Sequence, residues 1–219
     1  REMTLMLLID VSPSQAFGTT GKFKNEVAAE LAAVIAFLAT KNNDKVGLLV
    51  FSDHVEHYIH PQKGRGHVWN IIRTILTHEG KGRTTSFDES TRHFLHLCKK
   101  KTTCFLISDF LVSDYHSNLQ AISKKHDLIC ATIQDPAETI LPRAGWIDFV
   151  DAETGERIAV DTSGIGFGKR YEKEANKISE NKQHMWQKNA IDSFTVNTDG
   201  SVVDPLIRFF RNRERRLRR

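Results

Sequence analysis

Two hydroxyl side chains follow an aspartate at alternate positions near the start of this 219-residue chain: Asp10, Ser12 and Ser14. The apolar run before Asp10 is typical of a buried strand, and a loop that leaves a strand can point alternate side chains the same way. Carboxylate and hydroxyl oxygens are hard ligands of the kind that Mg²⁺ prefers, and Mn²⁺ is its near neighbour. The spacing therefore predicts part of a divalent-cation site at the end of the first strand.

Two later positions supply the groups that such a site still lacks. A second apolar run, at 103–109, also ends in an aspartate, Asp109, and the polar loop before a predicted helix holds Thr84, Thr85 and Ser86. In a doubly wound sheet the carboxyl ends of the strands meet at one edge, so these groups converge with the first three. Thr84 is the alternative to Thr85. The residues expected to hold the cation are Asp10, Ser12, Ser14, Thr85 and Asp109.

Strand and helix signals alternate along the chain, which indicates crossover units and a mainly parallel sheet with helices on both faces. The expected fold class is therefore doubly wound α/β (Rossmann-type), with one short antiparallel edge strand, His54–His60. We expect a single domain over 1–219, with 146–219 as a C-terminal extension packed on it. The expected strands are 5–10, 46–52, 54–60, 103–109, 127–133 and 192–196, with a hairpin at 146–150 and 157–160. The expected helices are 24–41, 67–78, 86–100, one around Leu119 and Ile122, 169–188 and 202–219.

The charge balance argues against a nucleic-acid-binding protein. The chain has 31 basic and 27 acidic residues, and the basic excess is concentrated in Arg208–Arg219. We interpret this tail as a terminal helix that docks through Leu206, Phe209 and Phe210 and ends in a solvated basic stretch. The alternative is that the basic end contacts an acidic partner or an anionic membrane surface.

The cysteines and the hydropathy pattern favour a reducing, aqueous compartment. Cys98, Cys104 and Cys130 have no metal-type spacing and are expected to be reduced thiols. No stretch approaches the roughly 20 apolar residues of a membrane span, and the chain shows no secretory leader. Because Arg1 directly precedes the first strand, we expect this chain to be a fragment of a longer cytoplasmic protein. Segments outside this fragment are the alternative source of a membrane anchor.

Several stretches of the chain resemble a known family. The spacing of Asp10, Ser12 and Ser14, with the Thr85 loop and Asp109, is similar to the metal-ion-dependent adhesion site (MIDAS) of von Willebrand factor A domains. The finer resemblance is to the bacterial domain-of-unknown-function 58 family, and it covers essentially the whole chain from residue 3. The stretches that carry it are DVSPSQAFG, VGLLVFSD, Gly82–Ser86, LISDF, HDLICATIQDPAE and VDTS.

The resemblance implies a magnesium-dependent protein-interaction domain that is not an enzyme. Its open coordination position would take an acidic group from a partner protein. Members of the family are often encoded beside MoxR-type AAA+ ATPases. The resemblance therefore implies that this chain works with such an ATPase in assembly or chaperone-like activity. The chain departs from the family pattern at Pro13, which stiffens the first loop, and at Ser86, where the family usually has an aspartate.

Three other interpretations compete with this one. Asp10, taken alone, also fits the N-cap of a helix. A metal-dependent phosphohydrolase would use Asp10 as its nucleophile, but it needs a second acid two positions later, where this chain has Ser12. The sequence also has no phosphate-binding loop of the GxxxxGK[ST] type. A zinc site would start from His54, His57 and His60, but no cysteine or carboxylate nearby completes a set of four ligands.

Overall fold

A six-stranded sheet forms the centre of the computed structural model, which describes residues 3–112 and 114–218. The strand order is β3-β2-β1-β4-β5-β8, and neighbouring strands are parallel except for β2 and β3. The strands are β1 (Thr4–Asp10), β2 (Lys45–Phe51), β3 (Val55–Gln62), β4 (Thr103–Ser108), β5 (Asp127–Gln134) and β8 (Asp192–Asn197). The doubly wound, mainly parallel α/β fold expected from the alternating apolar runs is thus confirmed.

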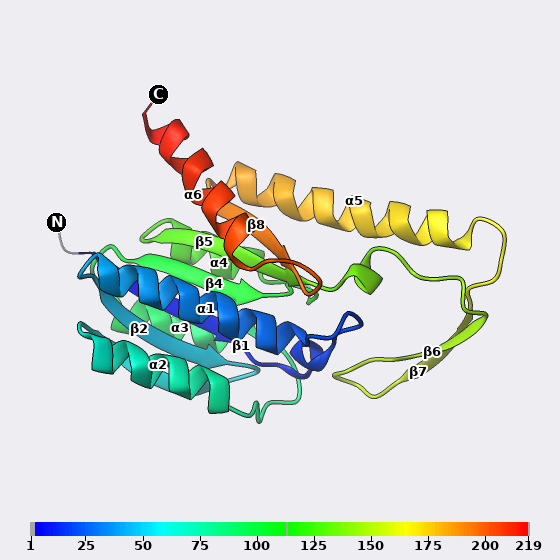
Figure 1. Ribbon diagram of the computed structural model, residues 1–219, viewed down its shortest axis with the longest axis horizontal. Coiled ribbons are helices and arrows are strands. Elements are labelled where there is room, and N and C mark those ends of the chain that lie inside the picture. The colour runs from blue at the N-terminus through cyan, green and yellow to red at the C-terminus, as the bar shows by residue number, and fades with distance from the viewer. Residues whose placement is uncertain (1–2, 113, 219) are drawn as a thin grey trace.

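Helices cover both faces of this sheet (Figure 1). One face packs against α1, α2 and α6, and the other packs against α3, α4 and the last turn of α5. Because side chains alternate along a strand, Leu7 and Ile9 of β1 enter the first core and Met6 and Leu8 enter the second. The helices are α1 (Lys24–Lys41), α2 (Arg65–Thr77), α3 (Phe87–Leu97), α4 (His116–Ser123), α5 (Phe167–Lys188) and α6 (Val203–Leu217).

Two elements differ in length from those expected. The helix expected to reach residue 100 ends at Leu97, and the three lysines 99–101 lie in the exposed link to β4. The helix ends because Cys98 has φ −96° and ψ 88°, a conformation outside the helical region. The antiparallel edge strand expected at 54–60 is β3, which ends two residues later, at Gln62, and pairs with β2 across two register shifts.

The C-terminal part of the chain divides between the main sheet and a separate hairpin. β6 (Trp146–Val150) and β7 (Arg157–Asp161) form a two-stranded antiparallel sheet of their own. β8 lies beside β5, and α6 buries Leu206 and Phe209 in the core, so the chain from residue 192 onward completes the main sheet. The hairpin projects beyond this sheet, and its tip points back toward the carboxyl edge (Figure 1).

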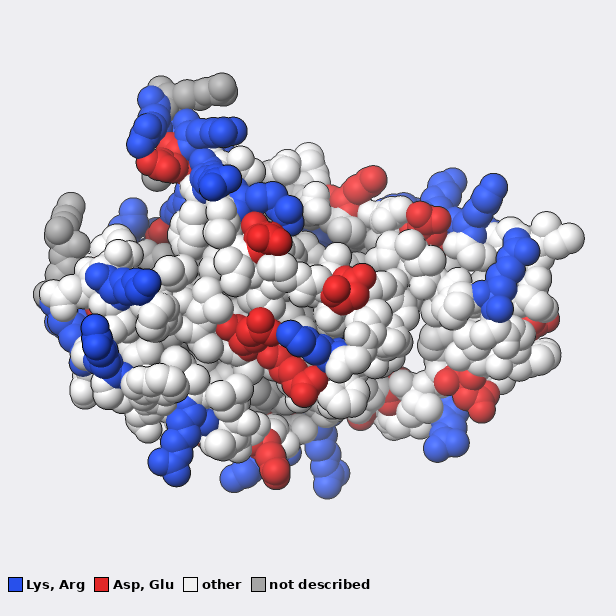
Figure 2. Space-filling view, in the orientation of Figure 1, with Lys and Arg blue, Asp and Glu red and all other residues white. Residues whose placement is uncertain are grey.

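The basic end of the chain is partly paired with acidic side chains. Arg213 of α6 contacts Asp127 and Asp192, the first residues of β5 and β8, and Arg216 Nη2 lies 2.7 Å from Asp192 Oδ1. Basic side chains crowd the outer end of α6 (Figure 2). The tail therefore lies at the amino edge of the sheet, opposite to the predicted cation site. Arg219, expected to end this helix, lies outside the described residues.

The described residues carry free thiols and no membrane-spanning helix. Cys98, Cys104 and Cys130 are free, and the last two are buried among the apolar side chains of the second core. Over residues 3–112 and 114–218, none of the helices has the length and apolar character needed to cross a bilayer.

Candidate metal and ligand site

The candidate site lies where the order of strands in the sheet reverses. From β1 the chain passes to β2 on one side, whereas β4 lies on the other side of β1 and leads to β5. Such a reversal leaves a crevice at the carboxyl ends of the strands, the usual binding position in open α/β sheets. Asp10 ends β1 and Asp109 directly follows β4, and these residues are 1% and 3% exposed. The two predicted carboxylates thus lie buried at the reversal.

Asp10 is held by hydrogen bonds from its own loop and from β4. Its Oδ1 accepts from the backbone N–H of Ser12 (2.9 Å), and its Oδ2 accepts from the hydroxyl of Ser108 (2.6 Å). Burial and, next, the charge of Asp109 raise the pKa of Asp10 to about 6. Asp10 therefore keeps its proton to a higher pH than an ordinary aspartate does.

A tight turn fixes Asp109 after its strand. The N–H of Phe110 donates to Ser108 Oγ (3.1 Å), and the N–H of Leu111 donates to Asp109 Oδ1 (3.2 Å). Phe110 has a φ of 55°, a left-handed conformation that is uncommon for a bulky residue. Strained backbone of this kind persists where the surrounding contacts enforce it, and here it turns the chain directly behind the carboxylate.

The two serines of the first loop lie side by side at the mouth of the crevice. Pro13 begins the short 3-10 helix η1 (Pro13–Ala16), and the loop brings Ser12 Oγ to 3.2 Å from Ser14 Oγ. Ser12 is buried, whereas Ser14 and Thr85 line a cleft of about 610 Å³. The structure thus brings all five predicted residues to one edge of the sheet, two on the cleft surface and three beneath it.

Glu56 on the edge strand fixes the loop that carries Thr85. Its carboxylate accepts hydrogen bonds from the backbone N–H groups of Lys81 (3.0 Å) and Gly82 (3.1 Å), and it lies 2.8 Å from His78 Nε2. Hydrogen bonds to the carboxylate outweigh its burial and lower the pKa of Glu56. Sequence reasoning missed this residue, because its partners become visible only when the loop folds back on β3.

A glycine in this loop lies directly against the first site loop. A Cβ on Gly80 would lie 2.2 Å from the carbonyl oxygen of Val11. Gly80→Ala should therefore displace the Thr85 loop and lower the free energy of unfolding by about 1–3 kcal/mol, as overpacking does. Gly66→Ala is the matched control, because a Cβ at this position in α2 meets nothing within 4 Å. Urea unfolding measures both variants, and equal stability would contradict the close approach.

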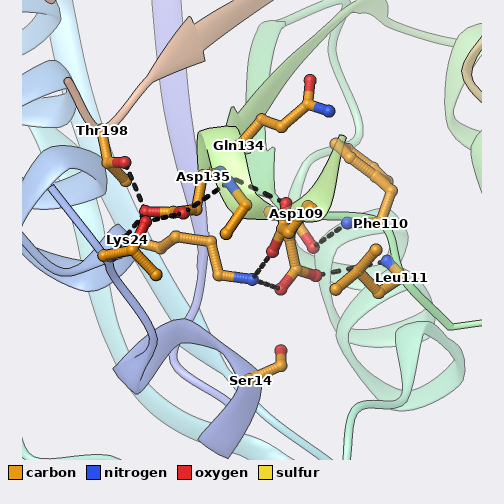
Figure 3. Close-up of polar contacts among 12 residues, drawn as sticks. Ser14, Lys24, Asp109, Phe110, Leu111, Gln134, Asp135 and Thr198 are labelled. Carbon is orange, nitrogen blue, oxygen red and sulfur yellow. Dashed lines mark hydrogen bonds and ion pairs between the residues drawn. The ribbon is translucent and has the colours of Figure 1, made fainter. Parts of the chain in front are cut away.

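A lysine that the sequence pattern did not single out neutralises part of the site. Lys24 Nζ lies 2.7 Å from Asp109 Oδ2 and 2.6 Å from Glu138 Oε1, and Lys24 is 1% exposed (Figure 3). Burial alone would lower the pKa of Lys24, but Asp109 and then Glu138 outweigh burial and raise it. One signal pointed to this role: Lys24 is the first residue of α1, where the helix dipole disfavours a cation.

Asp135 ties together the loops behind this ion pair. Its carboxylate accepts hydrogen bonds from the backbone N–H and the hydroxyl of Thr19 (2.8 and 2.5 Å) and from the hydroxyl of Thr198 (2.7 Å) (Figure 3). These hydrogen bonds outweigh burial and lower the pKa of Asp135. Asp135 also caps the short 3-10 helix η2 (Pro136–Glu138), which positions Glu138. The sequence indicated only a turn here, because the two threonines are distant along the chain.

The five predicted residues are of the types that bind a hard divalent cation. Two carboxylates and three hydroxyls offer oxygen donors only, and burial, followed by the charge of Asp109, raises the pKa of Asp10. Lys24 already supplies one positive charge to Asp109, so a metal ion would share that carboxylate with the ammonium. Over the described ranges, no group of three or more His, Cys, Asp or Glu side chains is arranged for a metal ion. What the chain offers to Mg²⁺ is a hydroxyl-rich set with two carboxylates.

Solved structures share this architecture. The chain is similar to the conserved hypothetical protein BatB from Bacteroides thetaiotaomicron, with a TM-score of 0.61 and 14% identity over 97% of this chain and 98% of that chain. It is similar to the VWA domain of SpRpn10, with a TM-score of 0.52 and 12% identity over 94% of each chain. At these identities the likeness concerns the fold alone, which is von Willebrand factor A-like.

The chain belongs to the family described as protein of unknown function DUF58, whose profile matches residues 1–181. It is 28% identical over 158 residues to the uncharacterized protein Rv1480 of Mycobacterium tuberculosis, covering 71% of this chain and 50% of that protein. The uncharacterized protein Mb1516 of Mycobacterium bovis matches to the same extent. The chain therefore spans about half the length of these curated relatives, and the family expected from the sequence motifs is confirmed.

Proposed function

We propose that this chain is a divalent-metal-dependent protein-interaction module whose MIDAS-type site binds an acidic group of a partner. The observation that supports the proposal is that Asp10 and Asp109 lie buried at the ends of neighbouring strands, and that Ser14 and Thr85 line an open cleft at the same edge of the sheet. Ser12 is buried with the carboxylates, and its hydroxyl lies 3.2 Å from that of Ser14 on the cleft. The proposed cation is Mg²⁺ or Mn²⁺, since every donor is an oxygen.

The residues have separate parts in this proposal. Asp10 and Asp109 would neutralise the cation, whereas the hydroxyls of Ser12, Ser14 and Thr85 would bind it without adding charge. A cation bound in this way supplies an electrophilic position for a carboxylate from outside. Before a cation binds, Lys24 balances the charge of Asp109 and keeps the crevice from opening by repulsion. The cleft beside Ser14 and Thr85 gives a partner access to the site.

The residue pattern at Asp10 favours binding over phosphoryl transfer. A metal-dependent phosphohydrolase would use Asp10 as its nucleophile and needs a second acid two positions later. The residue at that position is Ser12, which is not an acid and cannot protonate a leaving group. A phosphohydrolase of this kind is therefore the less favoured alternative.

A MoxR-type AAA+ ATPase is the partner that we propose on the strength of the family resemblance. Such a partner would present an aspartate or glutamate to the cleft in a cytoplasmic assembly or chaperone-like activity. The basic end of α6 lies at the opposite edge of the sheet, where Arg213 and Arg216 are paired with Asp192. Neither nucleic acid nor a membrane is part of this proposal.

Isothermal titration with Mg²⁺ tests the site directly. Wild-type protein should show one site, and Asp10→Asn and Asp109→Asn should each weaken binding by about tenfold or more, because each removes one of two carboxylate charges. Asp199→Asn is the matched control, since Asp199 also follows a strand of this sheet, β8, but is exposed. Unchanged heats in both site variants would overturn the metal assignment.

The same variants test the partner. Capture of the purified ATPase on immobilised protein should fall in EDTA and should fall equally in Asp10→Asn and Asp109→Asn. Capture at full strength in EDTA would show that the ATPase binds another face of the domain.

A further inference from the structure

The β6–β7 hairpin touches the candidate site at its tip. Glu153, in the turn between the two strands, accepts a hydrogen bond of 2.7 Å from the hydroxyl of Thr85. The two residues are 68 positions apart, and Thr85 belongs to the predicted cation site. Figure 1 shows the hairpin projecting beyond the sheet while its tip returns to the carboxyl edge. An acidic side chain of this chain thus lies where we expect that of a partner.

The turn itself holds Glu153 in this position. Asp151 Oδ1 accepts hydrogen bonds from the N–H groups of Glu153 (2.9 Å) and Thr154 (2.7 Å), and the Asp151 N–H donates to the carbonyl oxygen of Glu156 (2.8 Å). Gly155 has a φ of 72°, which allows the tight turn that follows. Bonds internal to the turn therefore fix the backbone at Glu153, and its side chain reaches the hydroxyl of Thr85.

The hairpin closes on itself at its base and faces a cleft. At the base, the hydroxyl of Thr162, just after β7, donates to the carbonyl oxygen of Gly145, just before β6 (2.8 Å). The cleft of about 610 Å³ is lined by Ser14 and Thr85 of the domain and by residues 149–153 of the hairpin, and Figure 2 shows a crevice there. An isolated two-stranded hairpin is only marginally stable in water, so a contact with the domain such as that of Glu153 with Thr85 helps to hold it in place.

The exposed faces of the hairpin agree with a segment that is not packed into a core. Trp146 of β6 is 73% exposed and Ile158 of β7 is 62% exposed. Gly145 and Gly166, with φ of 74° and 81°, flank the hairpin on either side. Such conformations favour glycine. Gly145 lies directly before β6, and Gly166 lies where α5 begins. The hairpin is thus flanked by glycines and contacts the domain through a polar side chain at its tip, so it can act as a latch that covers the site.

We propose that the β6–β7 hairpin is a latch in which Glu153 occupies the acidic-ligand position of the site, so that a partner's carboxylate binds only by displacing it. This proposal rests on the proposed metal site and states how access to that site is controlled. A cation beside Thr85 attracts the Glu153 carboxylate and strengthens the latch. Neutralising Glu153 therefore removes the internal competitor.

Hydrogen exchange of the amides in residues 146–161 tests the latch without a partner and without metal. In EDTA, Glu153→Ala and Thr85→Val should each speed this exchange by roughly three- to tenfold over wild type, because each removes a hydrogen bond to a charged group. Glu156→Ala is the matched control, since Glu156 lies in the same turn with an exposed side chain. If Glu153→Ala exchanges no faster than Glu156→Ala, the latch is wrong.

Adding Mg²⁺ separates failure of the latch from failure of the proposed function. Mg²⁺ should slow exchange of the hairpin in wild type and in Glu156→Ala, but not in Glu153→Gln, which keeps the shape of the side chain and loses its charge. A hairpin released by Glu153→Ala in EDTA but indifferent to Mg²⁺ in wild type would support the latch and overturn the metal site. If Mg²⁺ slows hairpin exchange as much in Glu153→Gln as in wild type, the proposed role of Glu153 is wrong, whereas the proposed metal site is supported.

Discussion

Replacing Lys24 with methionine should lower the free energy of unfolding of the metal-free protein by about 3–5 kcal/mol at pH 7. The ammonium is paired with Asp109 and Glu138, and the three side chains are 1%, 3% and 16% exposed. Methionine keeps most of the apolar stem but removes the ion-pair partner of two carboxylates in a poorly solvated crevice, where Lys182 then supplies the nearby positive charge. Urea unfolding in EDTA measures this loss.

Lys22→Met is the matched control for this experiment. Lys22 also pairs with a glutamate, Glu30, but their side chains are 51% and 45% exposed, so solvent screens the pair and its loss should change stability little. Mg²⁺ should restore part of the stability of Lys24→Met, because a cation beside Asp109 replaces the missing charge. Lys24→Arg keeps the charge and should fold even if Lys24→Met does not. Equal stability of Lys24→Met and Lys22→Met would show that Lys24 does not neutralise the site.

The metal-free protein should lose stability as the pH rises from 4 to 7, and Asp10→Asn should remove most of this loss. The pKa of Asp10 is about 6 in the folded state, against an ordinary value of 3.8. Between these values the folded state binds more protons than the unfolded state, so the free energy of unfolding falls as the pH rises. The contribution is complete below about pH 4 and is lost as the pH passes 6, and it amounts to about 3 kcal/mol.

Asparagine is a close replacement for Asp10 because it preserves both hydrogen bonds. Its oxygen can accept from the N–H of Ser12, and its amide can donate to the oxygen of Ser108. Urea midpoints between pH 4 and 8 in EDTA check the prediction, with Asp199→Asn as the control that should follow wild type. Saturating Mg²⁺ should abolish the decline in wild type, because a bound cation favours the ionised carboxylate. A slope in Asp10→Asn as steep as in wild type would contradict the raised pKa.

Both predictions express one property of the site, which is a shortage of positive charge. Three buried or nearly buried carboxylates, those of Asp10, Asp109 and Glu138, lie near the buried ammonium of Lys24, and the partly buried Lys182 also interacts electrostatically with Asp109 and Glu138. Without metal, the protein limits the repulsion by placing Lys24 on Asp109 and by favouring the protonated form of Asp10. A divalent cation would relieve the same repulsion, which is why its binding should appear as stability.

The sequence by itself determined the scaffold, and it predicted five site residues at one edge of the sheet. Apolar runs that end in Asp10 and Asp109 identify two buried strands, and a doubly wound sheet brings the ends of such strands to one edge whatever their other contacts. The alternation of Ser12 and Ser14 and the polar loop at Thr85 are local patterns of the same kind. Periodicity acts over a few residues, so it is readable without a structure.

Only the tertiary structure decided what balances and covers the site. Lys24 is 85 residues from Asp109 and 114 from Glu138 in the chain, and Thr85 is 68 residues from Glu153. A lysine or a glutamate on its own has no local pattern that names its partner, because an ion pair depends on where two distant segments meet after folding. For that reason, the sequence could predict a cation site open to another molecule. It could not predict the buried ammonium beneath that site or the chain's own carboxylate above it.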